Sequence, residues 1–332
     1  MGLIRFARNS FNRWLQVEAL RRHFSSQRLV DRPCALCGSP RLRLLIRGDR
    51  DRLGIHTSQC LDCGFIMSSP FYSADAVADF YRESYRALFK GQPDPKGLAG
   101  RHSYLRERVE FYAPILAEHG VVPAAGGYLL DVGCGEGTLL RTLRERHPGV
   151  NFAGVEPTLT YADHLVQDAG IPVVDDITRL DSAHQFDAIL LIHVLEHVHD
   201  PVSLLKQIGQ RLRPGGKVYV DVPDVAAHST VIDLHLAHCN HFSTHTLDSA
   251  LRRSGLRPLE LRAHRPPTLP PSIFAIAQFG AGLNGAGATD PDAEAYARRI
   301  SAINVGPVNR LTRLLGDRLR PPSSGVPPKE TD

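Results

Sequence analysis

The segment Leu129-Leu-Asp-Val-Gly-Cys-Gly-Glu-Gly-Thr-Leu-Leu140 decides the fold of this chain. It opens with a nearly continuous apolar run, as expected of a strand buried on both faces. Three alternating glycines follow, Gly133, Gly135 and Gly137. Glycine lets the backbone turn tightly and lets a ligand approach it closely. The segment therefore predicts a strand, a ligand-binding turn and the start of a helix.

The glycine spacing differs from the dinucleotide-binding fingerprint, which has glycine at its first, third and sixth positions. The sixth position here is Thr138. An acid, Glu156, closes the next expected strand in Gly154-Val-Glu-Pro157. A carboxylate at that point can accept two hydrogen bonds from ribose hydroxyls. The turn and the acid predict a site for a ribose-containing ligand that lies outside the dinucleotide pattern.

Strand-like runs alternate with helical segments on both sides of this turn, which is typical of a parallel α/β sheet. The expected parallel strands are Tyr128–Val132, Asn151–Val155, Pro172–Val174, Phe186–Ile192 and Lys217–Val222. One helix begins at Pro201 and is ended by Pro214-Gly-Gly216. Another spans Thr246–Arg253, with Ser243 or Thr244 near its start. The fold class is therefore α/β, with a doubly wound and mostly parallel sheet.

Two further strand-like runs, Leu256–Ala263 and Ser272–Gln278, have no long helical segment between them. We expect them to form an antiparallel pair at the edge of the sheet. Upstream of the sheet, residues 73–120 have helical patterns. Ser73 is a suitable N-cap for one helix, and a second helix is expected over residues 102–118.

Two cysteine pairs, Cys34-Ala-Leu-Cys37 and Cys60-Leu-Asp-Cys63, are each followed by a glycine. Two such turns can deliver four thiolates to one tetrahedral Zn²⁺. A redox dithiol is the alternative. All four expected ligands, Cys34, Cys37, Cys60 and Cys63, are cysteines, which leaves no open position for catalysis. We expect a structural zinc ribbon over residues 31–70, with an extra hairpin between the pairs.

The chain has 332 residues and a formal net charge of +4, which does not demand a nucleic-acid partner. The segment between the cysteine pairs is rich in arginine but has no aromatic ring to stack on a base. We therefore expect a solvated basic hairpin there. No run approaches the roughly 18 apolar residues of a membrane span, and paired cysteines suit a reducing compartment. We expect a cytoplasmic protein.

Five regions follow from these patterns. Residues 1–30 are expected to form a basic N-terminal helix, either docked on the body of the protein or acting as a transit peptide or membrane-surface helix. The zinc ribbon covers 31–70 and a helical linker or lid covers 71–125. The main domain covers 126–280. Residues 281–332 are expected to hold C-terminal helices and a disordered tail rich in proline and serine.

The turn Asp131-Val-Gly-Cys-Gly-Glu-Gly137 resembles the first motif of class I S-adenosylmethionine (SAM)-dependent methyltransferases. Within them the chain resembles the zinc-ribbon-bearing group that includes sugar methyltransferases. Further segments carry the resemblance in the order that the family has them, namely Cys60–Pro70, Phe80–Tyr85, Phe186–Pro201, Leu212–Gly216 and His241–Ser243. It covers roughly residues 31–280. It implies a seven-stranded Rossmann-like methyltransferase sheet with an antiparallel edge strand, preceded by the small zinc ribbon.

This resemblance implies a SAM site on the turn and on the neighbouring strand. Asp131, Gly133 and Gly135 would line the methionine part of SAM, with Gly137 completing the turn. Glu156 would hold the ribose. A generic nucleotide-binding turn is the alternative interpretation of these residues.

The resemblance also assigns the other end of the cofactor. In the pair Asp175-Asp176, the second acid would accept a hydrogen bond from the adenine amino group, although the first competes with it. Ile177 would lie near the adenine ring, and His193 would sit beside the sulfonium. Tyr81 or Tyr85 would cover the cofactor.

A general base helps methyl transfer when the acceptor is a hydroxyl or a carbon acid, and histidine suits that role near neutral pH. The candidates are His241, His238 and His197, with His241 preferred. A structural role as a helix cap is the alternative for His241. His197 could instead brace its loop, or form a metal site with Glu196 as in some O-methyltransferases. Sugar C-methyltransferases of this group have Glu-His where this chain has Asn240-His241, which leaves O-methylation open.

The hypothesis is a SAM-dependent methyltransferase that acts on a small polar acceptor such as a nucleotide-linked sugar or a glycan hydroxyl. An RNA or protein methyltransferase that docks through the zinc ribbon is one alternative, but the balanced charge disfavours it. A non-catalytic SAM-binding scaffold is another, and the histidine cluster disfavours that one.

Overall fold

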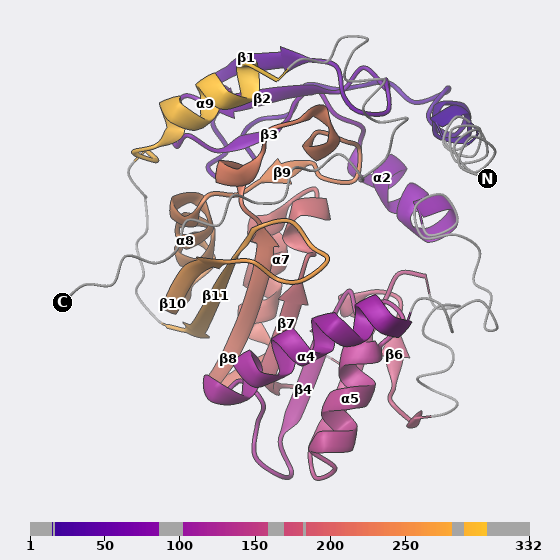
Figure 1. Ribbon diagram of the computed structural model, residues 1–332, viewed down its shortest axis with the longest axis vertical. Coiled ribbons are helices and arrows are strands. Elements are labelled where there is room, and N and C mark those ends of the chain that lie inside the picture. The colour runs from indigo at the N-terminus through magenta and orange to yellow at the C-terminus, as the bar shows by residue number, and fades with distance from the viewer. Residues whose placement is uncertain are drawn as a thin grey trace.

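The computed structural model describes residues 15, 17–85, 102–158, 169–181, 184–280 and 289–303. Its strands form a seven-stranded sheet and a four-stranded sheet, which lie next to each other (Figure 1). Most of the expected N-terminal helix and the expected C-terminal tail lie outside the described residues. In the described part of the chain, no helix has the length and apolar character that a membrane span needs.

The larger sheet is α/β in type and mostly parallel. Its strands are β4 (Tyr128–Val132), β5 (Asn151–Val155), β6 (Val173–Val174), β7 (Phe186–Ile192), β8 (Leu212–Pro223), β10 (Leu256–His264) and β11 (Ser272–Phe279). Their order is β10-β11-β8-β7-β4-β5-β6. The five neighbouring strands β8, β7, β4, β5 and β6 run parallel to one another. β11 runs antiparallel to both β8 and β10, which confirms the expected antiparallel pair at the edge.

One expectation about this sheet is wrong. Pro214-Gly-Gly216 was expected to end a helix, but the helix α7 (Pro201–Gln210) has already ended, and the three residues lie inside β8. The register of β7 with β8 shifts between Phe186 and Ala188, so the turn-forming residues are accommodated as an irregularity in the strand. A strand can therefore begin before the glycines that seemed to precede it.

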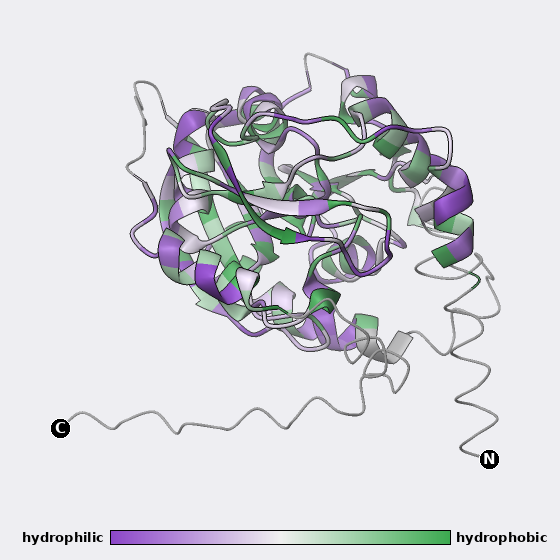
Figure 2. Cartoon of the chain, turned by 90° about the horizontal axis from the view of Figure 1, so that it is seen from above, coloured by the Kyte–Doolittle hydropathy of each residue, from purple (hydrophilic) through white to green (hydrophobic). Residues whose placement is uncertain are grey.

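Helices cover both faces of this sheet. Because successive strand residues point to opposite faces, Leu190 of β7 packs with α4 (His102–Glu118) and α5 (Thr138–Arg146), whereas Leu191 packs with α7 and α8 (Thr244–Arg253). In Figure 2 the apolar residues gather on the central strands, and the helices turn hydrophilic residues outward. This doubly wound arrangement is the one expected from the sequence.

Local capping explains where several helices begin. Asp200 accepts a hydrogen bond from the backbone of Ser203 and caps α7, with Pro201 in the first turn. Ser243 caps α8 and forms a capping box with Thr246. Ser73 caps α2 (Ala74–Phe80), as expected. The helix expected at residues 102–118 is α4, and α9 (Ala293–Ser301) is one of the expected C-terminal helices.

The smaller sheet contains β1 (Leu42–Arg47), β2 (His56–Cys60) and β3 (Ile66–Ser68) of the ribbon region, and it is completed by β9 (Asn240–His241) from far along the chain. The hairpin of β1 and β2 is the extra turn expected between the cysteine pairs. α9 packs on this sheet, where the Gln59 side chain donates to the carbonyl of Ala293. The ribbon is therefore joined to the main body by a shared strand as well as by the chain itself.

Candidate active site

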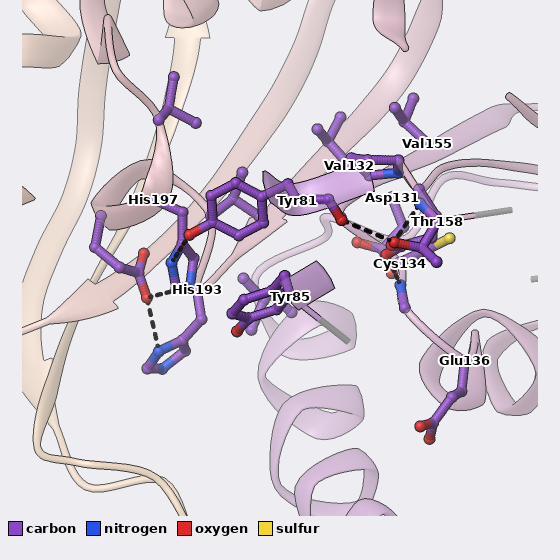
Figure 3. Close-up of a pocket in the computed structure, with 18 of the residues that line it drawn as sticks. Tyr81, Tyr85, Asp131, Val132, Cys134, Glu136, Val155, Thr158, His193 and His197 are labelled. Carbon is purple, nitrogen blue, oxygen red and sulfur yellow. Dashed lines mark hydrogen bonds and ion pairs between the residues drawn. The ribbon is translucent and has the colours of Figure 1, made fainter. Parts of the chain in front are cut away.

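A cavity of about 710 Å³ opens at the carboxyl ends of β4, β5 and β7. These parallel strands end at the same edge of the sheet, which is where open α/β sheets bind ligands. Its walls also include α4, the segment after α2 and the loop Leu269-Pro270. Figure 3 shows two groups of polar residues in it, with Tyr81 and Tyr85 between them. One group contains Asp131 and Thr158, and the other contains His193 and His197.

The first group is built on the glycine turn. Gly133, Gly135 and Gly137 all have positive φ, and all three line the cavity. At Gly133 a Cβ atom would lie 2.8 Å from the Val194 side chain, so a larger residue is excluded by contact as well as by conformation. Gly137 is the N-cap of α5 and has no side chain to accept from the backbone amides of the first turn, which lack partners within the helix. The turn can cradle a polar ligand against its backbone.

Two buried carboxyl groups lie beneath this turn. Glu156 accepts hydrogen bonds from the backbone of Gly135 at 3.0 Å and of Thr158 at 3.1 Å, which fixes the turn against the end of β5. Asp131 is buried at the end of β4. Burial, helped by the negative charge of Glu156, raises the pKa of Asp131 to about 8. This carboxyl group is therefore mostly protonated at neutral pH, and a nearby positive charge would favour its ionised form.

The adenine-side candidates lie after β6. Ile177 is buried and lines the cavity, in the short 3₁₀ helix η3 (Ile177–Arg179). Asp176 caps this helix by accepting from the backbone and the hydroxyl of Thr178. Asp175 also lines the cavity. The structure thus places all three expected residues at the cavity and adds a capping role for Asp176.

Tyr81 connects the two groups of residues. It begins the π-helix η1 (Tyr81–Tyr85), a rare form that is frequent at functional sites. Its carbonyl accepts from the Thr158 hydroxyl, while its own hydroxyl lies 3.0 Å from Nδ1 of His197 and 3.1 Å from the carbonyl oxygen of Ala237. Burial raises the pKa of Tyr81 well above its ordinary value, so the phenol stays protonated. Tyr85 packs against it at a ring distance of 4.7 Å.

The second group is a carboxylate between two histidines (Figure 3). Oε1 of Glu196 lies 3.1 Å from Nδ1 of His193 and 3.7 Å from Nε2 of His197. Burial disfavours the charged forms of both His193 and Glu196. For His193, the hydrogen bond and charge of Glu196 and the charge of Asp221 outweigh burial and raise its pKa. The charge of His197, followed by contact with His193, lowers the pKa of Glu196.

His193 has an unusual backbone and a second carboxylate behind it. Its φ is +56°, a conformation that is uncommon for residues other than glycine and that clusters at functional sites. Its Nε2 lies 3.3 Å from the Ser272 hydroxyl and 3.6 Å from Oδ1 of Asp221. Asp221 is fully buried and contacts Nε2 of His264 at 2.6 Å. The imidazole of His193 is therefore held between two acids.

Sequence reasoning missed Asp221, Ser272 and His264. One signal was present, because Asp221 is an acid inside the apolar strand Val218–Val222, where a charge is costly without partners. The other two come from β10 and β11, the strands that pair beside β8, so only the sheet order brings them together.

The three histidines expected to be catalytic have different positions. His197 and His238 line the cavity, and their rings lie 4.9 Å apart. Burial and the charges of neighbouring histidines lower the pKa of His238 well below its ordinary value. His241 does not line the cavity; it is buried in β9, where its Nδ1 lies 3.1 Å from Nε2 of His228. The preferred assignment of His241 as the base is therefore not supported by the geometry.

Ligand atoms of Glu196, His197 and His238 lie within 4.8 Å of one another, which is the geometry that the Glu-His metal alternative requires. Oε1 of Glu196 also contacts Nδ1 of His193, and Nδ1 of His197 lies 2.6 Å from the Ala237 carbonyl oxygen while its Nε2 lies on the side of Glu196. These contacts are compatible with a metal at this cluster, and the metal alternative stays a prediction.

The four cysteines of the ribbon converge on one point. The sulfur atoms of Cys34 and Cys63 lie 3.6 Å apart, as do those of Cys37 and Cys60, and all four lie within 4.8 Å of one another. A tetrahedral zinc with Zn–S bonds of about 2.3 Å needs sulfurs about 3.8 Å apart. Hydrogen bonds from neighbouring thiols, with Cys34 first, lower the pKa of Cys60, whereas the contacts within the same cluster raise the pKa of Cys34 and of Cys63. The donor set and spacing fit a structural zinc.

Comparison with known proteins agrees with this geometry. A family model described as a methyltransferase domain matches residues 99–261. A ubiquinone biosynthesis O-methyltransferase of Xylella fastidiosa (strain 9a5c) is 31% identical over 166 residues, which cover 46% of this chain and 63% of the relative. One from Azorhizobium caulinodans is 29% identical over 143 residues, covering 38% and 55%. The chain thus spans less than two thirds of the length of these relatives.

A solved structure shares the fold. The 1,6-didemethyltoxoflavin-N1-methyltransferase of Burkholderia thailandensis, with bound 1,6-didemethyltoxoflavin and S-adenosylhomocysteine, is 19% identical. It covers 66% of this chain and 97% of its own, with a TM-score of 0.50. Residues 99–261 therefore match a methyltransferase domain, and the sheet order and the glycine turn with its acids agree with the Rossmann-like methyltransferase fold.

Proposed function

We propose that this protein transfers the methyl group of SAM to a hydroxyl of a small molecule and releases S-adenosylhomocysteine. One observation carries the proposal: a single cavity joins the glycine turn and its acids to a buried histidine–carboxylate cluster, with Tyr81 between them. The named relatives are O-methyltransferases, which supports oxygen as the methylated atom.

The glycine end is assigned to SAM, which supplies an electrophilic methyl group when bound. Asp131 faces the cationic methionine part, and the backbone of Gly133–Gly135 lies along it. Glu156 offers its carboxylate to the ribose hydroxyls while it braces the turn. Ile177 and the acids before it border the adenine. Orientation of the acceptor oxygen in line with the methyl group supplies much of the rate, and no protein nucleophile is required.

The histidine end is assigned to the acceptor and its proton. The acceptor oxygen forms a bond to the methyl carbon, the carbon–sulfur bond breaks, and the hydroxyl proton passes to a histidine. We assign this role to His193, because it lines the cavity and the acids on either side raise its pKa above that of a free histidine. Glu196 orients the ring through Nδ1 and stabilises the protonated form. The proton then leaves to solvent.

Beside its histidines, the acceptor end of the cavity has apolar and aromatic side chains. They include Tyr85 and Tyr112 together with Val109, Leu269 and Pro270. These side chains favour an acceptor with a flat apolar ring, such as a phenol, over the nucleotide-linked sugar or glycan hydroxyl expected from the sequence, because a sugar requires many more hydrogen-bonding partners. We therefore propose a ring-bearing hydroxyl acceptor first and a sugar hydroxyl second.

Docking on RNA through the ribbon has less support. Two of its arginines have acidic partners: Arg41 pairs with Asp62, and Arg43 pairs with Glu294 at 2.8 Å. Their charges are therefore not all available to phosphates. We retain the proposal of a cytoplasmic enzyme, supported by the cysteine pairs that suit a reducing compartment.

The test combines calorimetry with turnover. Wild-type protein should bind SAM and release S-adenosylhomocysteine with phenolic acceptors faster than with nucleotide sugars. Glu156→Ala should weaken SAM binding roughly 10- to 100-fold, since a charged acceptor of several hydrogen bonds is lost. Glu156→Gln, which keeps one acceptor oxygen, should lose less. Wild-type protein without affinity for SAM, or Glu156→Ala with unchanged affinity, would contradict the proposal. Faster turnover of sugars would overturn the acceptor assignment alone.

A further inference from the structure

One buried arginine joins the ribbon to the loop that carries Glu196 and His197. Arg32 precedes the first cysteine pair and is only 7% exposed. Its Nε donates to the Ser68 carbonyl at 3.0 Å, and Nη1 donates to the His199 carbonyl at 3.2 Å. The guanidinium thus connects the end of β3 directly to the residues that follow the 3₁₀ helix η4 (Leu195–His197).

The same guanidinium reaches a third segment. Its Nη2 donates to Oδ1 of Asn240 at 3.0 Å and to the Cys239 carbonyl at 3.3 Å. Its hydrogen-bond partners among the described residues are all neutral oxygens. A buried cation is costly to desolvate, and neutral acceptors stabilise it less than a carboxylate would. This choice of partners indicates a role in orientation, because a carboxylate partner would stabilise the buried charge better.

Neighbouring contacts complete the junction. The Asn240 amide donates to the carbonyls of Val198 at 2.6 Å and Leu195 at 3.2 Å, and the backbone of Cys239 donates to the Glu196 carbonyl at 2.8 Å. β3 of the ribbon pairs with β9 at Ile66–His241 and Met67–Asn240. The loop 195–199 is therefore held from the ribbon side, through Arg32 and the segment 239–240.

We propose that Arg32 is a positioning residue, through which the ribbon sets the angle of the loop 195–199 and so places Glu196 and His197 in the cavity. This inference rests on the proposed function for its effect on turnover. Arginine suits the role because its planar fork presents several donors in fixed directions. A lysine at this position has one donor group and can reach fewer of the three segments at once.

The cofactor end has no direct contact with Arg32. The turn at Gly133–Gly137 follows β4, Glu156 follows β5, and Arg32 donates to neither. Tyr81 links Thr158, beside Glu156, to His197. Loss of Arg32 should therefore disturb the acceptor end while SAM binding is kept. A purely structural arginine would instead weaken both ends together with the whole fold.

The experiment uses the full chain with Arg32→Met and Arg32→Lys. Arg43→Met is the matched control, because Arg43 is another ribbon arginine with side-chain partners, but its partners Gln59 and Glu294 lie away from the loop. The primary readout is hydrogen–deuterium exchange of peptides over residues 195–199 and 237–240, compared with peptides over β4 and β5. SAM affinity by calorimetry and kcat with the best acceptor complete the set.

Arg32→Met should speed hydrogen exchange in the peptides over residues 195–199 and 237–240 and leave exchange in β4 and β5 unchanged. SAM affinity should stay within about threefold of the wild-type value. The value of kcat should fall roughly 10- to 100-fold, since small misplacements of catalytic groups slow the reaction strongly. Arg32→Lys should recover only part of kcat. Unchanged exchange at 195–199, or an equal loss of SAM affinity, would overturn the proposal. If Arg32→Met fails to fold, Asn240→Ser removes part of the same junction and should give the same exchange pattern. A wild type without turnover would refute the proposed function, while exchange would still decide the role of Arg32.

Discussion

The two ends of the cavity are built in different ways. The cofactor end comes from one short stretch of chain, residues 131–137, together with Glu156 at the end of the neighbouring strand. The acceptor end is assembled from β7, β8, β10 and β11, with the ribbon holding the loop after β7. The first depends on local backbone conformation, and the second depends on sheet order and on contacts between distant segments. Perturbations should therefore separate SAM binding from methyl transfer.

Loss of the ribbon metal should give the largest effect. Cys37→Ser removes one of four thiolate ligands, and we expect loss of one bound zinc per chain. The free energy of unfolding should fall by more than about 3 kcal/mol, which corresponds to a fall in Tm of about 4 °C or more. Because the ribbon holds the acceptor loop, turnover at a temperature where the protein remains folded should fall more than SAM affinity.

The control for this prediction is Asp62→Ala. Asp62 lies between the second pair of cysteines and forms a surface ion pair with Arg41, but it is not one of the expected ligands. Its loss should cost within about 1 kcal/mol. Metal analysis and thermal unfolding would check both variants. Full zinc content and an unchanged Tm in Cys37→Ser would refute the four-cysteine site.

His193 should be the most sensitive residue of the acceptor end. We expect His193→Asn to lower kcat about 10²- to 10⁴-fold, the usual contribution of a general base, because asparagine tolerates the left-handed backbone but does not accept the proton. His184→Asn, at an exposed histidine outside the cavity, is the control and should retain activity.

The pH profile gives a second check on the same residue. Acids beside His193 raise its pKa, and the neutral ring is the active base, so kcat should fall as the pH drops through that raised pKa. The acidic limb should therefore lie above the ordinary histidine value of about 6.5, and His193→Asn should lose it. A limb below that value, or one that persists in the variant, would refute the assignment.

A smaller effect is expected for the pH dependence of SAM binding. Burial raises the pKa of Asp131 to about 8, so this carboxyl group is mostly protonated at neutral pH. A cationic ligand favours the carboxylate, so binding should release a proton below about pH 8, and affinity should rise with pH up to that point, by at most about tenfold per unit. Calorimetry in buffers of different ionisation enthalpy would measure the release. Asp131→Asn should abolish it, and constant affinity between pH 6 and 8 would contradict this account.

Much of the fold could be predicted because buried parallel strands have continuous apolar sequences. The bounds of β4, β5 and β7 agree with the expectation residue for residue. Capping residues also indicated where α2 and α8 begin, because a cap forms its hydrogen bonds with residues close to it in the sequence. The beginning of β8 was wrong, because Pro214-Gly-Gly216 is absorbed into the strand by a register shift.

The acceptor end could be predicted only in part. His197 and His238 line the cavity, as their predicted catalytic role requires, whereas His241 does not. Neighbouring residues on a strand face opposite ways: Asn240 turns toward Arg32 and the loop after β7, while His241 turns toward His228. Arg32 has no local sequence signal, because it contacts His199 across 167 positions of the chain. His264 has none either, because only the order of β8, β11 and β10 in the sheet brings it to Asp221.

We propose that one cavity holds the methyl donor at the glycine turn, with its methyl group directed toward an acceptor hydroxyl beside His193. A crystal structure of the protein with S-adenosylhomocysteine tests it most directly. The account predicts the ribose on Glu156, the adenine beside Ile177, and the sulfur facing the side of the cavity where His193 lies. A product molecule bound elsewhere, or bound with its sulfur turned away from His193, would contradict it.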